Sequence, residues 1–149
     1  MPILRKARQH DLDRLTALLR LLFTIEEDFS FNEQKQRQGL FLLLDSDRGC
    51  VLVAEETGQV IGMCTGQLVI STAEGGPSVL VEDVVVDPAH RGQGIGRALM
   101  NTMAGWALEQ GATRLQLLAD KNNGPGLDFY ERLGWRTTAL ICLRQHLIG

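Results

Sequence analysis

The chain has 149 residues, a length that suits one domain with one hydrophobic core. It is 44% hydrophobic and 22% charged, which is typical of soluble globular proteins, and its formal net charge is −3. This mildly acidic chain has no basic run, so it lacks the charge pattern of proteins that bind nucleic acid or anionic membranes. This slight excess of negative charge suits a soluble enzyme and favours a cationic substrate.

The cysteines and histidines indicate neither a disulfide framework nor a metal site. The three cysteines, Cys50, Cys64 and Cys142, form no C-x-x-C pair and lie in apolar stretches, so we expect buried, reduced thiols. The three histidines lack the spacing of metal ligands. Apolar stretches are too short to span a bilayer, and the N-terminus has no signal-peptide pattern. We therefore expect a cytoplasmic protein without a metal.

The first half of the chain predicts a strand, two helices and a two-stranded hairpin. In chain order these elements are residues 3–7, 12–22, 32–44, 51–56 and 60–70. Asp11 is a candidate N-cap for the first helix, in which leucines recur at helical spacing. Thr57 and Gly58 form the turn of the hairpin.

The second half predicts a buried strand, a helix, a strand, a short helix and a last strand. In chain order these are residues 79–86, a helix after the glycines that ends at Gly111, and residues 114–119, 127–133 and 135–143. A loop with two glycines and a proline precedes them at 73–78. Residues 79–119 form a β-α-β unit whose two strands should be parallel, so the sequence predicts an α/β protein.

A glycine-rich segment follows the buried strand. It reads Arg91-Gly92-Gln93-Gly94-Ile95-Gly96, and it comes after Asp87-Pro88. A strand, a glycine turn and a helix start make an anion site, because the first N–H groups of a helix lack partners and its dipole adds partial positive charge. Glycines let the backbone approach a phosphate, and Arg91 and Arg97 can add positive charge.

Two other phosphate-binding loops are excluded. A dinucleotide-binding loop needs a third glycine where Arg97 stands, and a P-loop needs Gly-Lys-Ser/Thr, which is missing. A tight turn without a ligand is the remaining alternative. One arginine and three glycines at a helix start exceed what such a turn requires.

The segment resembles the coenzyme A-binding motif of the GNAT family of N-acetyltransferases, R/Q-x-x-G-x-G/A. Arg91, Gly94 and Gly96 stand at its fixed positions. The similarity extends upstream through residues 84–88 and downstream to Asn123 and Phe129-Tyr130-Glu131-Arg132-Leu133-Gly134-Trp135. The order of elements agrees with the GNAT fold. The resemblance implies one domain over residues 1–149, with a central mixed β-sheet flanked by helices on both faces.

The resemblance also implies acetyl-CoA as the donor. Backbone N–H groups would hold its pyrophosphate at Gly92, Gln93, Gly94, Ile95, Gly96 and Arg97, and the main chain of Val84, Val85 and Val86 would pair with the pantetheine arm. Asn123 would touch the cofactor or hold the gap between the strands at Val84 and Leu115. Because Gly124-Pro125-Gly126 stands where the family has helix-forming residues, we expect the next helix to start late.

Transfer of an acetyl group from a thioester to an amine needs a base. An alkylammonium has a pKa of about 10.4 and must lose a proton before it can attack the thioester. Glu82 and Asp83 lie within the apolar strand, where burial would tune a carboxylate for this task. Alternation puts them on opposite faces of the sheet unless a bulge shifts one of them. In the family the position of Glu82 often supplies the base, so we select Glu82. The alternative is a structural acid.

Tyr130 is the only tyrosine of the chain. In the family the matching tyrosine approaches the sulfur and can protonate the departing thiolate. A thiol is a fair leaving group unaided, so this role would help without being essential. Packing on the pantetheine arm is an equal alternative.

In the family the two helices after the first strand cover the acceptor, and here their junction carries Glu26, Glu27, Asp28, Phe29 and Phe31. Acids beside aromatic rings could bind a cation with an apolar body, so Glu26, Glu27 and Phe29 are candidate substrate-binding residues. A solvated helix end with both phenylalanines in the core is the alternative. We expect a small primary amine, polyamine-like or otherwise cationic, as the acceptor.

Two other functions stay open. One is acetylation of protein N-termini or lysines, and the other is a non-catalytic, CoA-binding regulatory module. The C-terminal edge at Leu147 and Ile148 is apolar, and members of the GNAT family commonly dimerise, so we expect a homodimer.

Overall fold

The computed structural model describes residues 1–25 and 28–148, which cluster into two compact units, Met1–Leu117 and Leu118–Gly149. Each unit is described by itself. Within these residues, no helix combines the length and the apolar character needed to cross a membrane.

The first unit is built on a five-stranded sheet in the order β1-β2-β3-β4-β5. Its strands are β1 (Ile3–Lys6), β2 (Gly49–Glu56), β3 (Gln59–Ser71), β4 (Gly76–Val86) and β5 (Leu115–Leu117). The first four strands are antiparallel neighbours, and β5 runs parallel to β4. The mixed sheet is therefore as predicted, and the β-α-β unit ends in a parallel pair.

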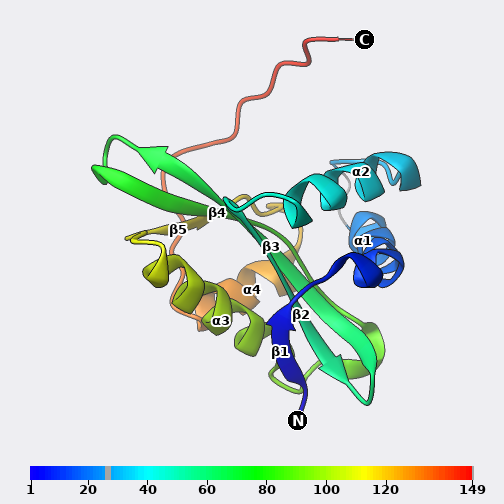
Figure 1. Ribbon diagram of the computed structural model, residues 1–149. Coiled ribbons are helices and arrows are strands. Elements are labelled where there is room, and N and C mark those ends of the chain that lie inside the picture. The colour runs from blue at the N-terminus through cyan, green and yellow to red at the C-terminus, as the bar shows by residue number, and fades with distance from the viewer. Residues whose placement is uncertain (26–27, 149) are drawn as a thin grey trace. The chain divides into compact units, whose positions relative to one another are not determined.

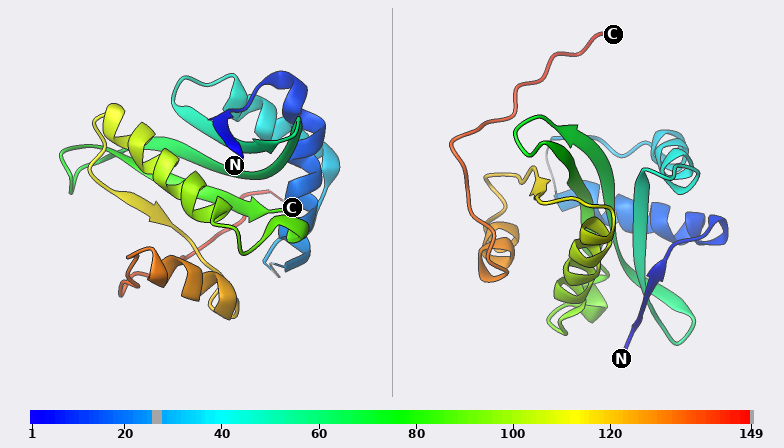
Figure 2. Two further views of the ribbon diagram at one scale, coloured as in Figure 1. Left: turned by 90° about the horizontal axis from the view of Figure 1, so that it is seen from below. Right: turned by 60° about the vertical axis from the view of Figure 1, so that its left-hand side comes forward.

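Helices cover both faces of this sheet, which confirms the predicted fold class. They are α1 (Leu12–Ile25), α2 (Glu33–Leu44) and α3 (Ile95–Glu109). α1 and α2 lie on one face and α3 lies on the other (Figures 1 and 2). The α1 leucines pack with Met63 and Val85 of the sheet in one buried cluster, because helical spacing puts them on one side of the helix.

Glycine sets the distance between α3 and the sheet. A Cβ atom on Gly66 of β3 would lie 2.7 Å from the Sδ of Met103 and 3.0 Å from a methyl carbon of Val79. The helix approaches the strand so closely because Gly66 has no side chain. The buried face of α3, which includes Leu99 and Met103, therefore rests directly on the strands.

Two helix starts were expected, and one of them differs. Asn32 caps α2, because its side-chain oxygen accepts a hydrogen bond from the Lys35 N–H at 3.2 Å. Asp11 does not cap α1. It ends a short 3-10 helix, η1 (Gln9–Asp11), and accepts hydrogen bonds from the Arg8 N–H and the Arg5 guanidinium, both at 2.8 Å. The pairing with Arg5 holds the pKa of Asp11 below its ordinary value despite burial.

The second unit contains the helix α4 (Gly124–Arg132). The expected late start is wrong, because Asn123 caps the helix and Pro125 suits its first turn. Tyr130 packs within this unit, with ring centroids 5.1 Å from Phe129 and 5.7 Å from Trp135.

The predicted last strand, residues 135–143, is wrong. The described residues after α4 include no strand. Valine- and leucine-rich runs become strands only where a neighbouring strand takes up their hydrogen bonds, and pattern alone does not supply that neighbour. Cys142 in this segment is exposed, so its expected burial is also wrong. Cys50 and Cys64 are buried as predicted, and burial raises the pKa of Cys50 to about 11.

Candidate active site

A bulge interrupts β4 at the two predicted acids. Met63 of β3 pairs with Val85 and Thr65 pairs with Glu82, so two β4 residues stand opposite one residue of β3. Asp83, within the bulge, has a φ of 55°. The buried Thr65 hydroxyl lies 3.0 Å from the Glu82 carbonyl oxygen and 3.0 Å from Asp83 Oδ2, so it anchors the bulge from the neighbouring strand.

The bulge puts the two acids on the same face of the sheet. Strict alternation would separate Glu82 and Asp83, yet both line one cavity on the face that α1 and α2 cover. The bulge that could place both acids on one face is therefore present. The expected burial of Glu82 is wrong, because its side chain is exposed, whereas Asp83 is half-buried. The Glu82 carboxylate makes no ion pair or hydrogen bond with any described residue.

The cavity has a volume of about 610 Å³ and is bounded by α1, α2 and the central strands. Apolar side chains form its walls and polar ones stand among them. The lining residues are Leu19, Phe23, Lys35, Gln36, Gly39, Leu40, Leu42, Leu43, Ser46, Arg48, Gly49, Gln67, Leu68, Glu82 and Asp83. An apolar wall with a few polar groups is typical of a small-molecule site.

Of the candidate substrate-binding residues, none that the structure describes lines this cavity. Glu26 and Glu27 lie outside the described residues. Phe29 is exposed, and its ring centroid lies 6.3 Å from that of Phe23, which lines the cavity. The sequence missed Phe23, although it follows Leu19 at helical spacing and could have been found from that pattern.

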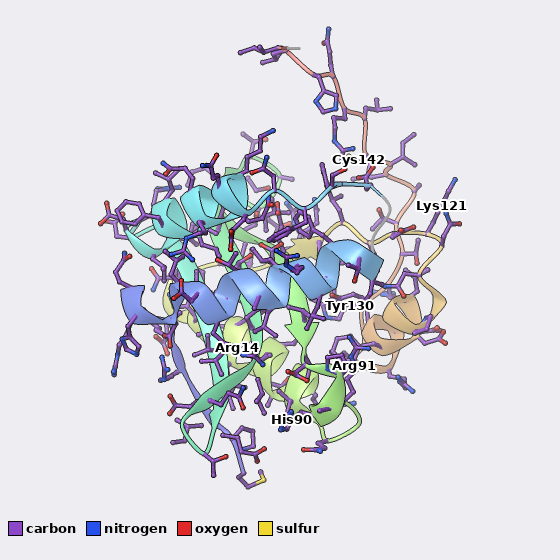
Figure 3. The ribbon with its side chains drawn as sticks, turned by 90° about the vertical axis from the view of Figure 1, so that its right-hand side faces the viewer. Arg14, His90, Arg91, Lys121, Tyr130 and Cys142 are labelled. Atoms are coloured by element: carbon purple, nitrogen blue, oxygen red, sulfur yellow. The ribbon has the colours of Figure 1, made fainter. Side chains whose placement is uncertain are left out.

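A network of hydrogen bonds positions the glycine loop. β4 leads into a short 3-10 helix, η2 (Pro88–His90), and Asp87 caps it by accepting from the Ala89 N–H at 3.0 Å. Asp87 also pairs with Arg14 of α1 at 2.7 Å. These two contacts, first the Ala89 N–H and then Arg14, hold the pKa of Asp87 below its ordinary value. Figure 3 shows Arg14, His90 and Arg91 in this part of the unit.

The loop after η2 has the conformation of an open cradle. Gly92 and Gly94 have φ values of 76° and 80°, which favour glycine. A Cβ atom on either would meet nothing within 4 Å, so the space beside them is open to a ligand. Gly94 is the N-cap of α3 and offers no side chain to its first turn. The backbone therefore fits a phosphate group at this helix start.

Arg91 and the end of β4 complete this region. The Arg91 Nε donates to the Val86 carbonyl oxygen at 3.2 Å, and its guanidinium stays exposed. The ladder between β4 and β5 ends at Val81 and Leu117. Among the described residues of the first unit, no strand pairs with the β5 side of residues 84–86. That open edge fits the expected pairing with an extended pantetheine arm.

Asn123 and Tyr130 lie in the second unit. The Asn123 side-chain oxygen accepts from the Gly126 N–H at 3.2 Å, so it is the N-cap of α4. Cofactor contact by Asn123 and thiolate protonation by Tyr130 stay predictions. No group of histidine, cysteine and acidic side chains suited to a metal occurs among the described residues.

Known proteins are similar to this chain in sequence and in fold. The pattern of the Acetyltransferase (GNAT) family matches residues 5–135. A streptothricin acetyltransferase of Streptomyces lavendulae is 38% identical over 74 residues, 50% of this chain and 39% of that protein. A glucosamine 6-phosphate N-acetyltransferase of Trypanosoma brucei brucei is 33% identical over 87 residues, 58% of this chain and 57% of that protein. The chain thus spans less than two thirds of either relative.

Solved structures agree over the full length. A putative acetyltransferase from Agrobacterium tumefaciens superposes with a TM-score of 0.81 at 25% identity, covering 96% of this chain and 99% of that one. The fold and the residue pattern thus point the same way.

Proposed function

The chain belongs to the GNAT acetyltransferase family, and we propose that it transfers the acetyl group of acetyl-CoA to a primary amine of a small molecule. One observation carries the proposal: β4 presents two carboxylates to a cavity and then leads, through η2, into an open glycine loop whose backbone fits a phosphate. The two named relatives act on streptothricin and on glucosamine 6-phosphate, which supports a small-molecule acceptor.

In the proposed reaction, Glu82 and Tyr130 carry out separate proton transfers. Bound acetyl-CoA supplies a thioester carbonyl as the electrophile. Glu82 takes the proton of the acceptor ammonium, directly or through water, since its carboxylate is exposed and unpaired among the described residues. The neutral amine attacks the carbonyl carbon, the C–N bond forms and the C–S bond breaks. Tyr130 is the proposed proton donor to the departing thiolate, and the proton that the new amide nitrogen loses returns to Tyr130 through water.

The loop and the strand edge hold the donor in this scheme. Backbone N–H groups from Gly92 to Arg97 bind the pyrophosphate, and Arg91 adds positive charge. The main chain of residues 84–86 pairs with the pantetheine arm along the open edge of β4. Arg14 keeps the loop in place through Asp87.

The shape of the cavity favours small molecules over proteins. Acetylation of protein N-termini or lysines predicts an open groove. Here α1 and α2 form walls of the cavity, and its volume of about 610 Å³ is typical of small ligands. A non-catalytic module would have no use for an exposed, unpaired carboxylate beside the donor site.

Two further proposals concern the whole chain. We propose that residues 1–149 form one domain, because the family match crosses the boundary between the two compact units. We also propose a homodimer. Large apolar side chains of the last segment are 80 to 92% exposed: Leu140, Ile141, Leu143, Leu147 and Ile148. A second copy could cover them.

Thiol release from acetyl-CoA with a panel of amines, amino acids and peptides tests the function. We expect release with small amines. Glu82→Gln should lower kcat about 100-fold or more, because a general base contributes that much, while acetyl-CoA affinity stays nearly unchanged. Tyr130→Phe should lower kcat by less, since the thiol leaves unaided.

Glu109→Gln is the matched control, because it neutralises an exposed carboxylate at the end of α3, away from the glycine loop. Full turnover of Glu82→Gln at every pH would contradict the base assignment. Tight CoA binding without release for any acceptor would favour the regulatory module, and release with peptides alone would favour the protein acetyltransferase.

A further inference from the structure

We infer that the acceptor carries an anionic group in addition to its amine, and that Lys35 and Arg48 bind this group. The inference rests on the proposed acetyl transfer and narrows the class of acceptor. It follows from the charges that line the cavity and from their separation along the sheet.

The cavity is lined by both signs of charge. Glu82 and Asp83 come from the bulge of β4, Lys35 comes from the first turn of α2, and Arg48 directly precedes β2. A site for a simple diamine or polyamine needs carboxylates at both ends and gains nothing from two cations. A site for an amine with a carboxylate or phosphate needs one sign at each end.

The two cations are available to a ligand. Neither Lys35 nor Arg48 forms an ion pair with a carboxylate of the described residues. Arg48 makes one long hydrogen bond, from Nη2 to the Leu68 carbonyl oxygen at 3.4 Å. Arg37, also on α2, is different, because it pairs with Asp13 at 2.6 Å. The unpaired guanidinium of Arg48 can grip a carboxylate or phosphate with two parallel hydrogen bonds.

The register of the strands separates the two ends of the site. Glu82 stands opposite Thr65 on β3, and the Arg48 guanidinium lies at the carbonyl of Leu68, three residues further along the same strand. Three residues of strand span about 10 Å. Gln67 lines the cavity between these positions and can bond to polar atoms of the ligand.

Apolar side chains also line the cavity. Leu19 and Phe23 of α1 and Leu40 of α2 line the cavity together with the charged groups. The acceptor that fits is therefore a molecule with an ammonium at one end, an anion roughly 10 Å away, and a body with apolar surface between them.

Matched acceptors test this inference. The panel consists of straight-chain primary amines of graded length, in four series whose far end is a carboxylate, a phosphate, a hydroxyl or a second amine. We expect kcat/KM for the anionic series to exceed that of the hydroxyl and diamine series by about tenfold or more at the preferred length, because hydrogen bonds to charged groups are strong. Lys35→Gln and Arg48→Gln should each raise KM for the anionic acceptors by about tenfold.

The same variants should leave kcat, the KM for amino alcohols and the affinity for acetyl-CoA unchanged. Arg37→Gln, which removes a charge from α2 outside the cavity, is the control and should change none of these values. A preference for diamines, or an unchanged KM in both Lys35→Gln and Arg48→Gln, would overturn the inference and leave acetyl transfer standing.

Calorimetric titration separates this result from failure of the proposed function. If no acceptor released thiol, acetyl transfer would be wrong, and titration with the carboxylate-ended amines would decide the inference. Binding that is weakened by Arg48→Gln would support the anion site, and binding that is equal in wild type and variant would overturn it.

Discussion

Asp83 occupies a backbone conformation that few residues adopt. Its φ of 55° falls in the left-handed region, which aspartate and asparagine tolerate better than other side chains and β-branched residues hardly at all. Val84, Val85 and Val86 follow in β4, so a valine at position 83 would extend this apolar run. Aspartate instead permits the bulge, and the bulge leaves Asp83 on the cavity side of the sheet together with Glu82.

Substitutions at Asp83 test this conformational role. Asp83→Val should lower the free energy of unfolding by about 1–3 kcal/mol, because the bulge forces a β-branched residue into positive φ. Asp83→Asn should cost less than about 1 kcal/mol, since asparagine tolerates the same φ. Urea unfolding measures both values.

Asp83→Gly separates strain from the lost contact with Thr65. Glycine adopts positive φ without strain, so Asp83→Gly reports the missing carboxylate and the added backbone freedom. Valine and asparagine variants of equal stability would show that the conformation at residue 83 does not limit stability.

Among the elements, α3 depends on one position of β3. Gly66→Ala should destabilise the fold by about 1–3 kcal/mol, because the new methyl group would overlap Met103 and Val79. Gly105→Ala, within α3, is the control. Its Cβ would meet nothing within 4 Å, so it should raise stability by about 0.5–1 kcal/mol through helix propensity.

Thermal unfolding followed by circular dichroism measures the two glycine variants. Met103→Ala removes part of the overlap with a side chain at position 66. Gly66→Ala should therefore cost less stability in the Met103→Ala background than in the wild type. Equal stability of Gly66→Ala and wild type would mean that α3 moves away from the strand without cost.

Periodicity was sufficient for most elements because they bury one face. The leucines of α1 and the valines of β4 fix helix and strand through burial alone. Periodicity does not report partners. It placed a strand over 135–143, where the described residues form none, and it could not say whether β4 contained the bulge at Asp83.

At the scale of the molecule, the proposed donor site could be predicted from the sequence better than the proposed acceptor site. The glycine loop was predictable because its conformation is local, with Gly92 and Gly94 at positive φ before a helix. The cavity was not, because Lys35 and Arg48 come from separate elements and line one cavity only through packing. No spacing in the sequence joins them to Glu82.

The exposed C-terminal segment makes the proposed homodimer testable. Sedimentation velocity should give a dimer for the full chain, because burying the apolar side chains of residues 140–148 against a second copy removes them from water. The double variant Leu140→Asp/Leu143→Asp should shift the chain to monomer, since charge on that surface opposes burial. Its circular dichroism should stay unchanged, because neither side chain is packed in the described structure.

Leu108→Asp is the control for added charge, because Leu108 is an exposed apolar residue on α3, distant in sequence from this segment. It should remain a dimer. A monomeric wild-type chain would contradict the homodimer outright. A dimer that survives Leu140→Asp/Leu143→Asp would place the contact on another surface and leave the C-terminal segment without a role in assembly.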